Sequence, residues 1–256
     1  MQSLQILFYI LTALLGLAFG SFLNVCIFRI PKHESIVFGR SHCMECGGEI
    51  EARDLVPLFS YIFLRGQCRK CSAKISLRYP LVELLNALLW LAALWAFGIT
   101  PYAFICMAFI SGIIVVSFID FDTKLVPIEP ILFIFAVGVV SCFFSGGMPF
   151  YDKIGGVLAG AIPLLVISLV SRGGMGGGDV EFAGAAGLML GWKLTLLALF
   201  CGFVTGGIYG AVLLLFAHRD GKSEMPFIPF IAAGLLISLF FGNTIINFYL
   251  SAFHLG

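Results

Sequence analysis

The sequence predicts an all-α polytopic membrane protein with about eight transmembrane helices and one small cytoplasmic loop domain that binds zinc. Hydrophobic residues make up 60% of the 256-residue chain, and charged residues make up only 11%. An ordinary soluble domain is about 45–50% apolar and about 25% charged. The mean hydropathy is +1.06. This composition excludes a soluble enzyme and a disordered chain, and the apolar runs are too long for the strands of a membrane barrel.

Eight apolar segments approach the roughly 20 residues that a spanning helix needs. In chain order they cover residues 4–27, 81–97, 102–119, 128–144, 154–170, 182–190, 194–216 and 227–250. The sixth is too short to span unless it begins near Asp179 and tilts, or enters the bilayer only part-way. The first is too long for a signal peptide, has no basic residues before it and lacks an A-x-A cleavage site.

The lysines and arginines predict the orientation of the chain. If all eight segments span, 13 of the 15 basic residues fall on one side, and only Lys153 and Lys193 fall on the other. Cytoplasmic loops carry an excess of Lys and Arg, so the basic side is predicted to be cytoplasmic and both termini to face outward. Omitting the sixth span would move Arg219 and Lys222 outside, which favours eight spans over seven.

Three regions follow from this topology: a first transmembrane helix over 1–28, a cytoplasmic domain over 29–80 and a transmembrane core over 81–256. About 50 residues are too few for a stable core without a staple. The cytoplasmic region contains four of the eight cysteines. The other four lie within spans and are predicted to be small buried residues.

The cytoplasmic cysteines form two C-x-x-C pairs, Cys43 with Cys46 and Cys68 with Cys71. Two such pairs at this separation are typical of a four-cysteine site for Zn²⁺, in which the metal replaces the missing core. Disulfides and a redox pair are the alternatives. The predicted reducing compartment disfavours disulfides, and no thioredoxin-like pattern surrounds the pairs. His42 is a further possible ligand that four cysteines make unnecessary.

Ionisable residues in or beside spans are costly and are therefore functional candidates. They are Glu83, Asp120, Asp122, Glu129, Asp179 and Glu181. Asp120 ends one apolar segment and Asp179 precedes another, both at predicted cytoplasmic ends. Two close carboxyl groups share a proton, so one activates water as a base while the other protonates a leaving group. We therefore predict a carboxylate pair, with solvated acids that pair with Lys or Arg as the alternative.

Three glycines precede the second acid, Gly176, Gly177 and Gly178. Without Cβ atoms, such a backbone can approach an extended substrate segment closely. The alternative is a flexible loop. Glu181 could form an ion pair with Arg172 or cap the sixth helix. Glu83 is expected to make a structural hydrogen bond where helices pack.

These motifs together resemble the prepilin peptidases, or type IV leader peptidases, of the GxGD aspartic protease class. The resemblance covers nearly the whole chain. It rests on residues 20–31, both C-x-x-C pairs, residues 76–83, 119–120 with 125–127, 176–179, and 226–230. A lysine is common in the family where Glu181 stands, an acid commonly follows Pro127 where Ile128 stands, and a glycine is often found in place of Ile228.

The resemblance implies an enzyme of the bacterial inner membrane that cuts the basic leader from type IV prepilins or type II secretion pseudopilins on the cytoplasmic side. It implies Asp120 and Asp179 as the catalytic pair, with Asp122 in a supporting role. Many members also methylate the new N-terminal amine with S-adenosylmethionine, for which the sequence shows no Rossmann-type loop.

Two other classes remain open, a proton-coupled transporter and a non-catalytic assembly scaffold. A transporter usually places its acids near mid-bilayer in repeated halves, and no repeat is visible here. The formal net charge of +1 gives no field to attract nucleic acid, so no nucleic-acid partner is predicted. Membrane lipid is an expected partner, and the oligomeric state is not predicted.

Overall fold

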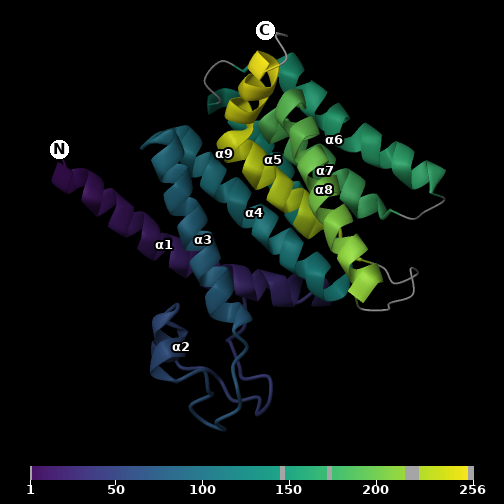
Figure 1. The fold of residues 1–256 in the computed structure, drawn as a ribbon. Helices are drawn as coiled ribbons and strands as arrows, with labels where there is room; N and C mark the ends of the chain where they lie inside the picture. The colour runs from purple at the N-terminus through teal and green to yellow at the C-terminus, as the bar shows by residue number, and fades with distance from the viewer. Residues whose placement is uncertain (1, 145–147, 172–174, 217–224, 253–256) are drawn as a thin grey trace. The chain divides into compact units, whose positions relative to one another are not determined.

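The computed structural model describes residues 2–144, 148–171, 175–216 and 225–252, and within these ranges the fold is helical with no β-strand. Eight apolar helices follow one another (Figure 1). They are α1 (Gln2–Arg29), α3 (Arg78–Phe97), α4 (Pro101–Thr123), α5 (Ile128–Phe144), α6 (Phe150–Val170), α7 (Gly177–Leu190), α8 (Trp192–Phe216) and α9 (Ile228–Ala252). The predicted all-α class is confirmed.

Six of these helices are long and apolar enough to cross a membrane, namely α1, α3, α4, α6, α8 and α9. Helix α5 is apolar but has only 17 residues, and α7 has 14. At about 1.5 Å per residue, α7 is about 21 Å long, against a hydrocarbon core of about 30 Å. A multi-pass architecture is therefore supported, while the count of eight full spans stays a prediction.

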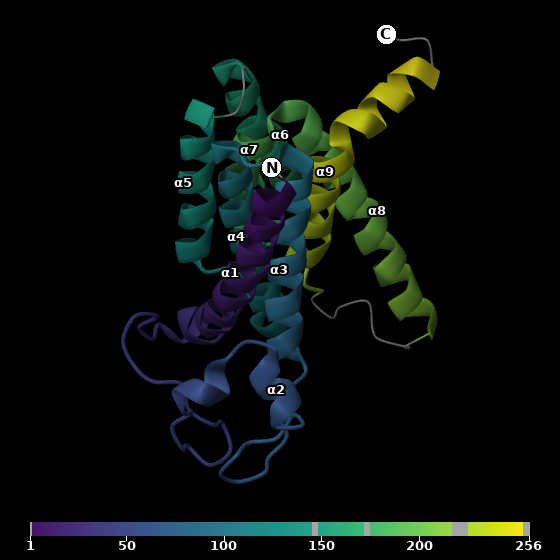
Figure 2. The same ribbon diagram turned by 90° about the vertical axis from the view of Figure 1, so that its left-hand side faces the viewer.

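The chain divides into two compact units, Met1–Val115 and Val116–Gly256, with the boundary inside α4. In the first unit, α1 packs along α3 (Figure 2). Gly16 and Gly20 of α1 lie directly against the α3 backbone, because a Cβ at either would approach a Cα atom of α3 to within 2.7 Å. Asn86 Nδ2 donates to the carbonyl of Gly16 at 2.8 Å, so small residues and a buried amide join the two helices.

Between α1 and α3 lies a segment that we call the four-cysteine loop, residues 30–77. It contains two short 3-10 helices, η1 (Ile30–Lys32) and η2 (Ala52–Leu55), and one short α-helix, α2 (Phe59–Phe63). Its only pairing of extended backbone within the described chain consists of two isolated bridges, His42 with Glu49 and Gln67 with Lys74. With so little regular structure, the loop depends on other contacts to keep one conformation.

In the second unit, α7 packs against α5, α6, α8 and α9. The α6–α7 contact is close because both helices present small residues there (Figure 1). A Cβ on Gly156 of α6 would collide with the carbonyl of Gly187 on α7, and one on Gly160 would collide with the carbonyl of Ala183. Small residues at this spacing let two membrane helices approach backbone to backbone. Helix α7 is thereby buried along residues 182–190.

Candidate active site and metal centre

Asp120 lies in the last turn of α4, and its side chain is only 4% exposed. Its carboxylate accepts a hydrogen bond of 3.1 Å from the backbone N–H of Ile228, the first residue of α9. The Thr123 hydroxyl donates to the Ile119 carbonyl and accepts from the N–H of Leu125, which ends the helix. Asp120 is thus held between the end of one helix and the start of another.

Asp179 lies in the first turn of α7 and is 8% exposed. Its backbone N–H donates to the carbonyl of Gly176, the N-cap residue, at 3.2 Å. An acid in the first turn is favoured by the helix dipole, which places partial positive charge there. The predicted sixth segment began at residue 182, whereas the helix begins at Gly177, so the structure adds Asp179 to the helix itself.

The segment that follows α4 and the start of α7 are in direct contact. Gly178 packs against Val126, which belongs to the short segment after α4, and a Cβ on Gly178 would lie only 2.5 Å from the Cβ of Val126. Asp120 and Asp179 are close enough to interact electrostatically. The two acids that the sequence singled out are therefore brought together within one unit. We call them the acid pair.

Both carboxyl groups of the acid pair are buried, and Asp120 accepts a hydrogen bond from the backbone N–H of Ile228. Two carboxyl groups that lie close together resist simultaneous ionisation. This arrangement suits general acid–base chemistry on a water molecule.

Three other predicted acidic residues are more exposed than the acid pair. Asp122 and Glu181 are exposed, as is Glu129. Gly177 has open space where a Cβ would be, which leaves its backbone approachable. Arg172, a possible partner for Glu181, lies outside the described residues.

The four loop cysteines converge on one point. The sulfur atoms of Cys43, Cys46, Cys68 and Cys71 all lie within 4.8 Å of one another, and Cys43 Sγ is 3.8 Å from Cys71 Sγ. Tetrahedral coordination with metal–sulfur bonds of about 2.3 Å places sulfurs about 3.8 Å apart. The cluster therefore has the dimensions of a four-thiolate metal centre.

Each C-x-x-C pair forms the same tight turn. The Cys43 N–H donates to Gly48 and the Gly47 N–H donates back to Cys43, both at 2.9 Å. The second pair repeats this pattern: the Cys68 N–H donates to the Ala73 carbonyl at 2.8 Å, and the Ser72 N–H donates to the Cys68 carbonyl at 2.9 Å. Gly47 has φ +66°, so a glycine is well suited there, while Ser72 takes φ +59° in the second turn. The turns thus orient both thiol pairs before any metal binds.

The four thiols differ in how readily they ionise. Backbone N–H groups of Cys46 and Glu45 lower the pKa of Cys43 to about 6. For Cys71, the N–H of Ala73 acts in the same direction, but desolvation and the hydrogen bonds with the other three thiols outweigh it and raise the pKa to about 12. One thiolate forms readily and further ones are opposed by it, so a divalent cation would be needed to ionise all four.

Two contacts whose partners the sequence did not predict hold the loop against its helices. Arg29, the last residue of α1, donates to the carbonyls of Ser35 and Phe38 at 2.8 and 2.9 Å, and to two more at 3.3 Å. Glu83 of α3 accepts a hydrogen bond of 2.7 Å from the N–H of Leu58, whose φ is +62°. Glu83 does make the expected hydrogen bond, but its partner is the loop.

The fold and the site define a multi-pass membrane protein with a buried acid pair and a cluster of four cysteines. Residues 14–97 match the bacterial peptidase A24 N-terminal domain, and residues 107–211 match the type IV leader peptidase family. The chain belongs to the type IV leader peptidase family, which confirms the resemblance noted in the sequence.

Curated relatives carry the name prepilin leader peptidase/N-methyltransferase. The chain is 35% identical to that of Bacillus subtilis (strain 168), over 92% of this chain and 95% of the relative. It is 32% identical to that of Aeromonas salmonicida, over 96% and 94% of the two chains. It is 31% identical to that of Pseudomonas aeruginosa, over 95% and 93%. The comparison with solved structures gave no match.

Proposed function

We propose that this protein is an aspartic endopeptidase that removes the basic leader from type IV prepilins or type II secretion pseudopilins and then methylates the new N-terminal amine. Family membership and the names of the relatives support both activities. The observation that carries the peptidase assignment is the burial of Asp120 and Asp179 on either side of the contact between Gly178 and Val126. The transporter and scaffold alternatives are not favoured by the family.

The acid pair would cleave the peptide bond by activating water. Asp120 and Asp179 share one proton, and the ionised carboxylate takes a proton from a water molecule held between them. The resulting hydroxide adds to the scissile carbonyl. The protonated carboxyl group then donates its proton to the departing amine, and the C–N bond breaks. One proton of the water is then on the carboxylate that acted as base, and the other is in the new carboxyl group of the leader. The Ile228 N–H keeps the Asp120 carboxylate oriented throughout.

The surroundings of the pair suit a membrane-anchored substrate. The apolar segment of a prepilin would enter between helices while its basic leader stays in the cytoplasm, which matches the predicted cytoplasmic side of the inner membrane. The open backbone at Gly177 is available to pair with an extended segment. We keep Asp122 and Glu181 as supporting acids at the exposed edge of the site.

The four cysteines would hold a zinc ion with a structural role. Four protein thiolates close the coordination sphere, so the metal would offer no open position for substrate. Its contribution would be to replace a hydrophobic core in the loop. Cys43, Cys46, Cys68 and Cys71 are the ligands in this proposal.

The test is cleavage of a leader-bearing prepilin by the detergent-solubilised protein, with no proton gradient present. Asp120→Asn and Asp179→Asn should each reduce the rate at least about 1,000-fold, because neither variant can share a proton between two carboxyl groups. The exposed Glu129→Gln is the matched control. Normal processing by either aspartate variant would rule out the acid pair, and a wild-type protein that cleaves no prepilin under these conditions would contradict the peptidase function.

A further inference from the structure

One short helix of the four-cysteine loop exposes large apolar side chains. Within α2, the exposed fractions are 49% for Phe59, 61% for Ile62 and 82% for Phe63. Residues three and four positions apart lie on one side of a helix, so the three side chains form one surface. We call them the apolar face. Apolar side chains that gather on a surface in this way commonly mark a place where another molecule or a membrane is bound.

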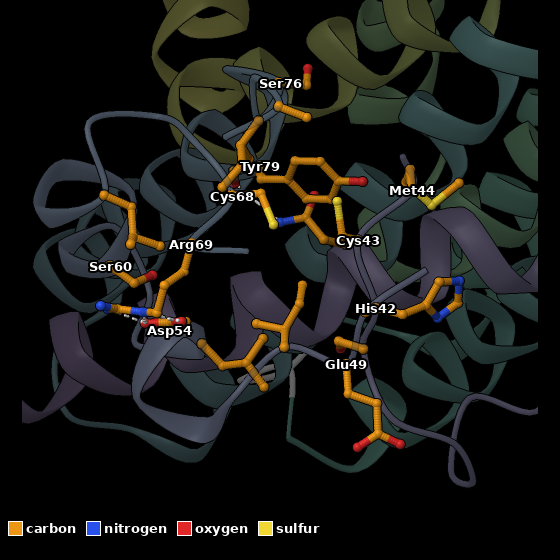
Figure 3. Close-up of a pocket in the computed structure, with 18 of the residues that line it drawn as sticks. His42, Cys43, Met44, Glu49, Asp54, Ser60, Cys68, Arg69, Ser76 and Tyr79 are labelled. Carbon is orange, nitrogen blue, oxygen red and sulfur yellow. Dashed lines mark hydrogen bonds and ion pairs between the residues drawn. The ribbon is translucent and has the colours of Figure 1, made fainter. Parts of the chain in front are cut away.

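Another side of α2 packs into the loop. Ser60 and Leu64 line a pocket inside the loop, as do Asp54 and Arg69, whose ion pair is visible in Figure 3. Arg69 Nη2 donates to Asp54 Oδ1 at 2.6 Å, so the segment just before α2 is bound to the second C-x-x-C pair. The apolar face therefore cannot turn inward without breaking these contacts.

A hydrogen bond places the start of α2 beside a spanning helix. The N–H of Leu58, the residue before α2, donates to Glu83 of α3 at 2.7 Å. Helix α3 has 20 residues and is therefore about 30 Å long, which is about the thickness of the hydrocarbon core. All of α3 is thus needed to cross that core, including the second turn, in which Glu83 lies. It follows that α2 begins at the depth of the bilayer surface.

The outer surface of α3 is apolar at the same depth. Leu77, Leu81 and Leu84 are exposed, and their spacing puts them on one side of the helix. In a spanning helix, such a side faces lipid. Arg65, which is exposed and follows Phe63 by two residues, adds a positive charge of the kind that meets lipid phosphates. The apolar face and its basic neighbour thus lie where acyl chains and headgroups meet.

We propose that α2 is an interfacial membrane anchor, with the apolar face among the first carbons of the acyl chains and Arg65 at the lipid phosphates. Phenylalanine and aliphatic side chains beside basic residues are the features of segments that lie in the membrane surface. A single short helix suffices here, because two spanning helices already keep its local concentration at the membrane high. The four-cysteine loop would then rest on the bilayer instead of extending into solvent.

The experiment uses the full-length protein in phospholipid nanodiscs, with a benzophenone-bearing phenylalanine in place of Phe63. After irradiation, mass spectrometry should detect covalent phospholipid adducts at this position. The same probe in place of Glu45, which is exposed between two of the cysteines, should give at least about 10-fold fewer adducts. An unchanged melting temperature shows that the probe has not unfolded the protein.

Variants of Phe63 test the apolar face itself, with the probe in place of Phe59 as the reporter. Phe63→Asp should reduce phospholipid adducts at position 59 at least about fivefold, because a carboxylate is costly among acyl chains. Phe63→Leu is the matched control and should keep them. Equal adduct yields at positions 63 and 45, or crosslinks from position 63 to protein alone, would overturn the proposal.

Discussion

Gly178 is the point at which the first turn of α7 touches the segment that follows α4. Its neighbour Val126 would meet an added Cβ at 2.5–3.0 Å through all three of its side-chain carbons. Observed Cβ contacts are not this short, so any larger residue must separate the two segments. Since Asp179 is the next residue and Asp120 lies near the end of α4, a separation here would widen the acid pair.

We therefore expect Gly178→Ala to lower prepilin cleavage at least about 10-fold, because displacements of about 1 Å in a catalytic group have effects of this size or larger. The double variant Gly178→Ala with Val126→Gly removes the opposing carbons and should recover most of the lost rate, measured against Val126→Gly alone. Equal rates for Gly178→Ala and wild type would show that the contact does not set the geometry of the pair.

At the scale of elements, α7 depends on its packing more than on its length. Ten of its 14 residues are buried, and its contact with α6 is made backbone to backbone at Gly156 and Gly187. Close approach of this kind increases dispersion contacts between helices in an apolar solvent, where the hydrophobic effect between them is absent. The helix that carries Asp179 is thus fixed by residues with no functional group.

Gly156→Ala should destabilise the protein by about 1–3 kcal/mol, the usual cost of forcing extra volume into a packed site. A lower melting temperature in detergent, together with a reduced cleavage rate, is the expected result. Gly207→Ala on α8 is the control, because a Cβ there meets nothing within 4 Å. Identical melting temperatures for the two variants would contradict the packing argument.

At the scale of the whole molecule, each unit has its own site: the acid pair in one and the four-cysteine cluster in the other. The loop has two isolated bridges and three short helices, so the proposed metal, together with Arg29 and Glu83, would supply most of its order. Loss of the metal should therefore affect the first unit much more than the second.

Elemental analysis of the purified protein should give about one zinc per chain, and Cys68→Ser should lose it. Metal-free protein should become sensitive to trypsin within the loop, which has many basic residues, while prepilin cleavage is reduced but not abolished. The second unit has its own packing, which is why cleavage should persist in part. A loop that stays resistant to trypsin after the metal is removed would show that hydrogen bonds alone maintain it.

Sequence patterns predicted the features that depend on composition and spacing. The apolar segment 81–97 corresponds to α3 (Arg78–Phe97), and both C-x-x-C pairs converge as their spacing indicated. The start of α7 was missed because its first turn consists of glycine and acidic residues that an apolar window excludes. The contacts of Arg29 with loop carbonyls and of Gly178 with Val126 were also missed, since backbone partners leave no periodic mark in a sequence.

The position of Arg29 has a consequence for biosynthesis. All four of its carbonyl partners lie within the next 11 residues, so this bend needs no part of the chain beyond Arg40. The nascent polypeptide can therefore adopt the bend before either C-x-x-C pair has left the ribosome. The metal centre would then assemble beside a segment that is already held to the end of α1, since Cys43 lies only three residues after Arg40.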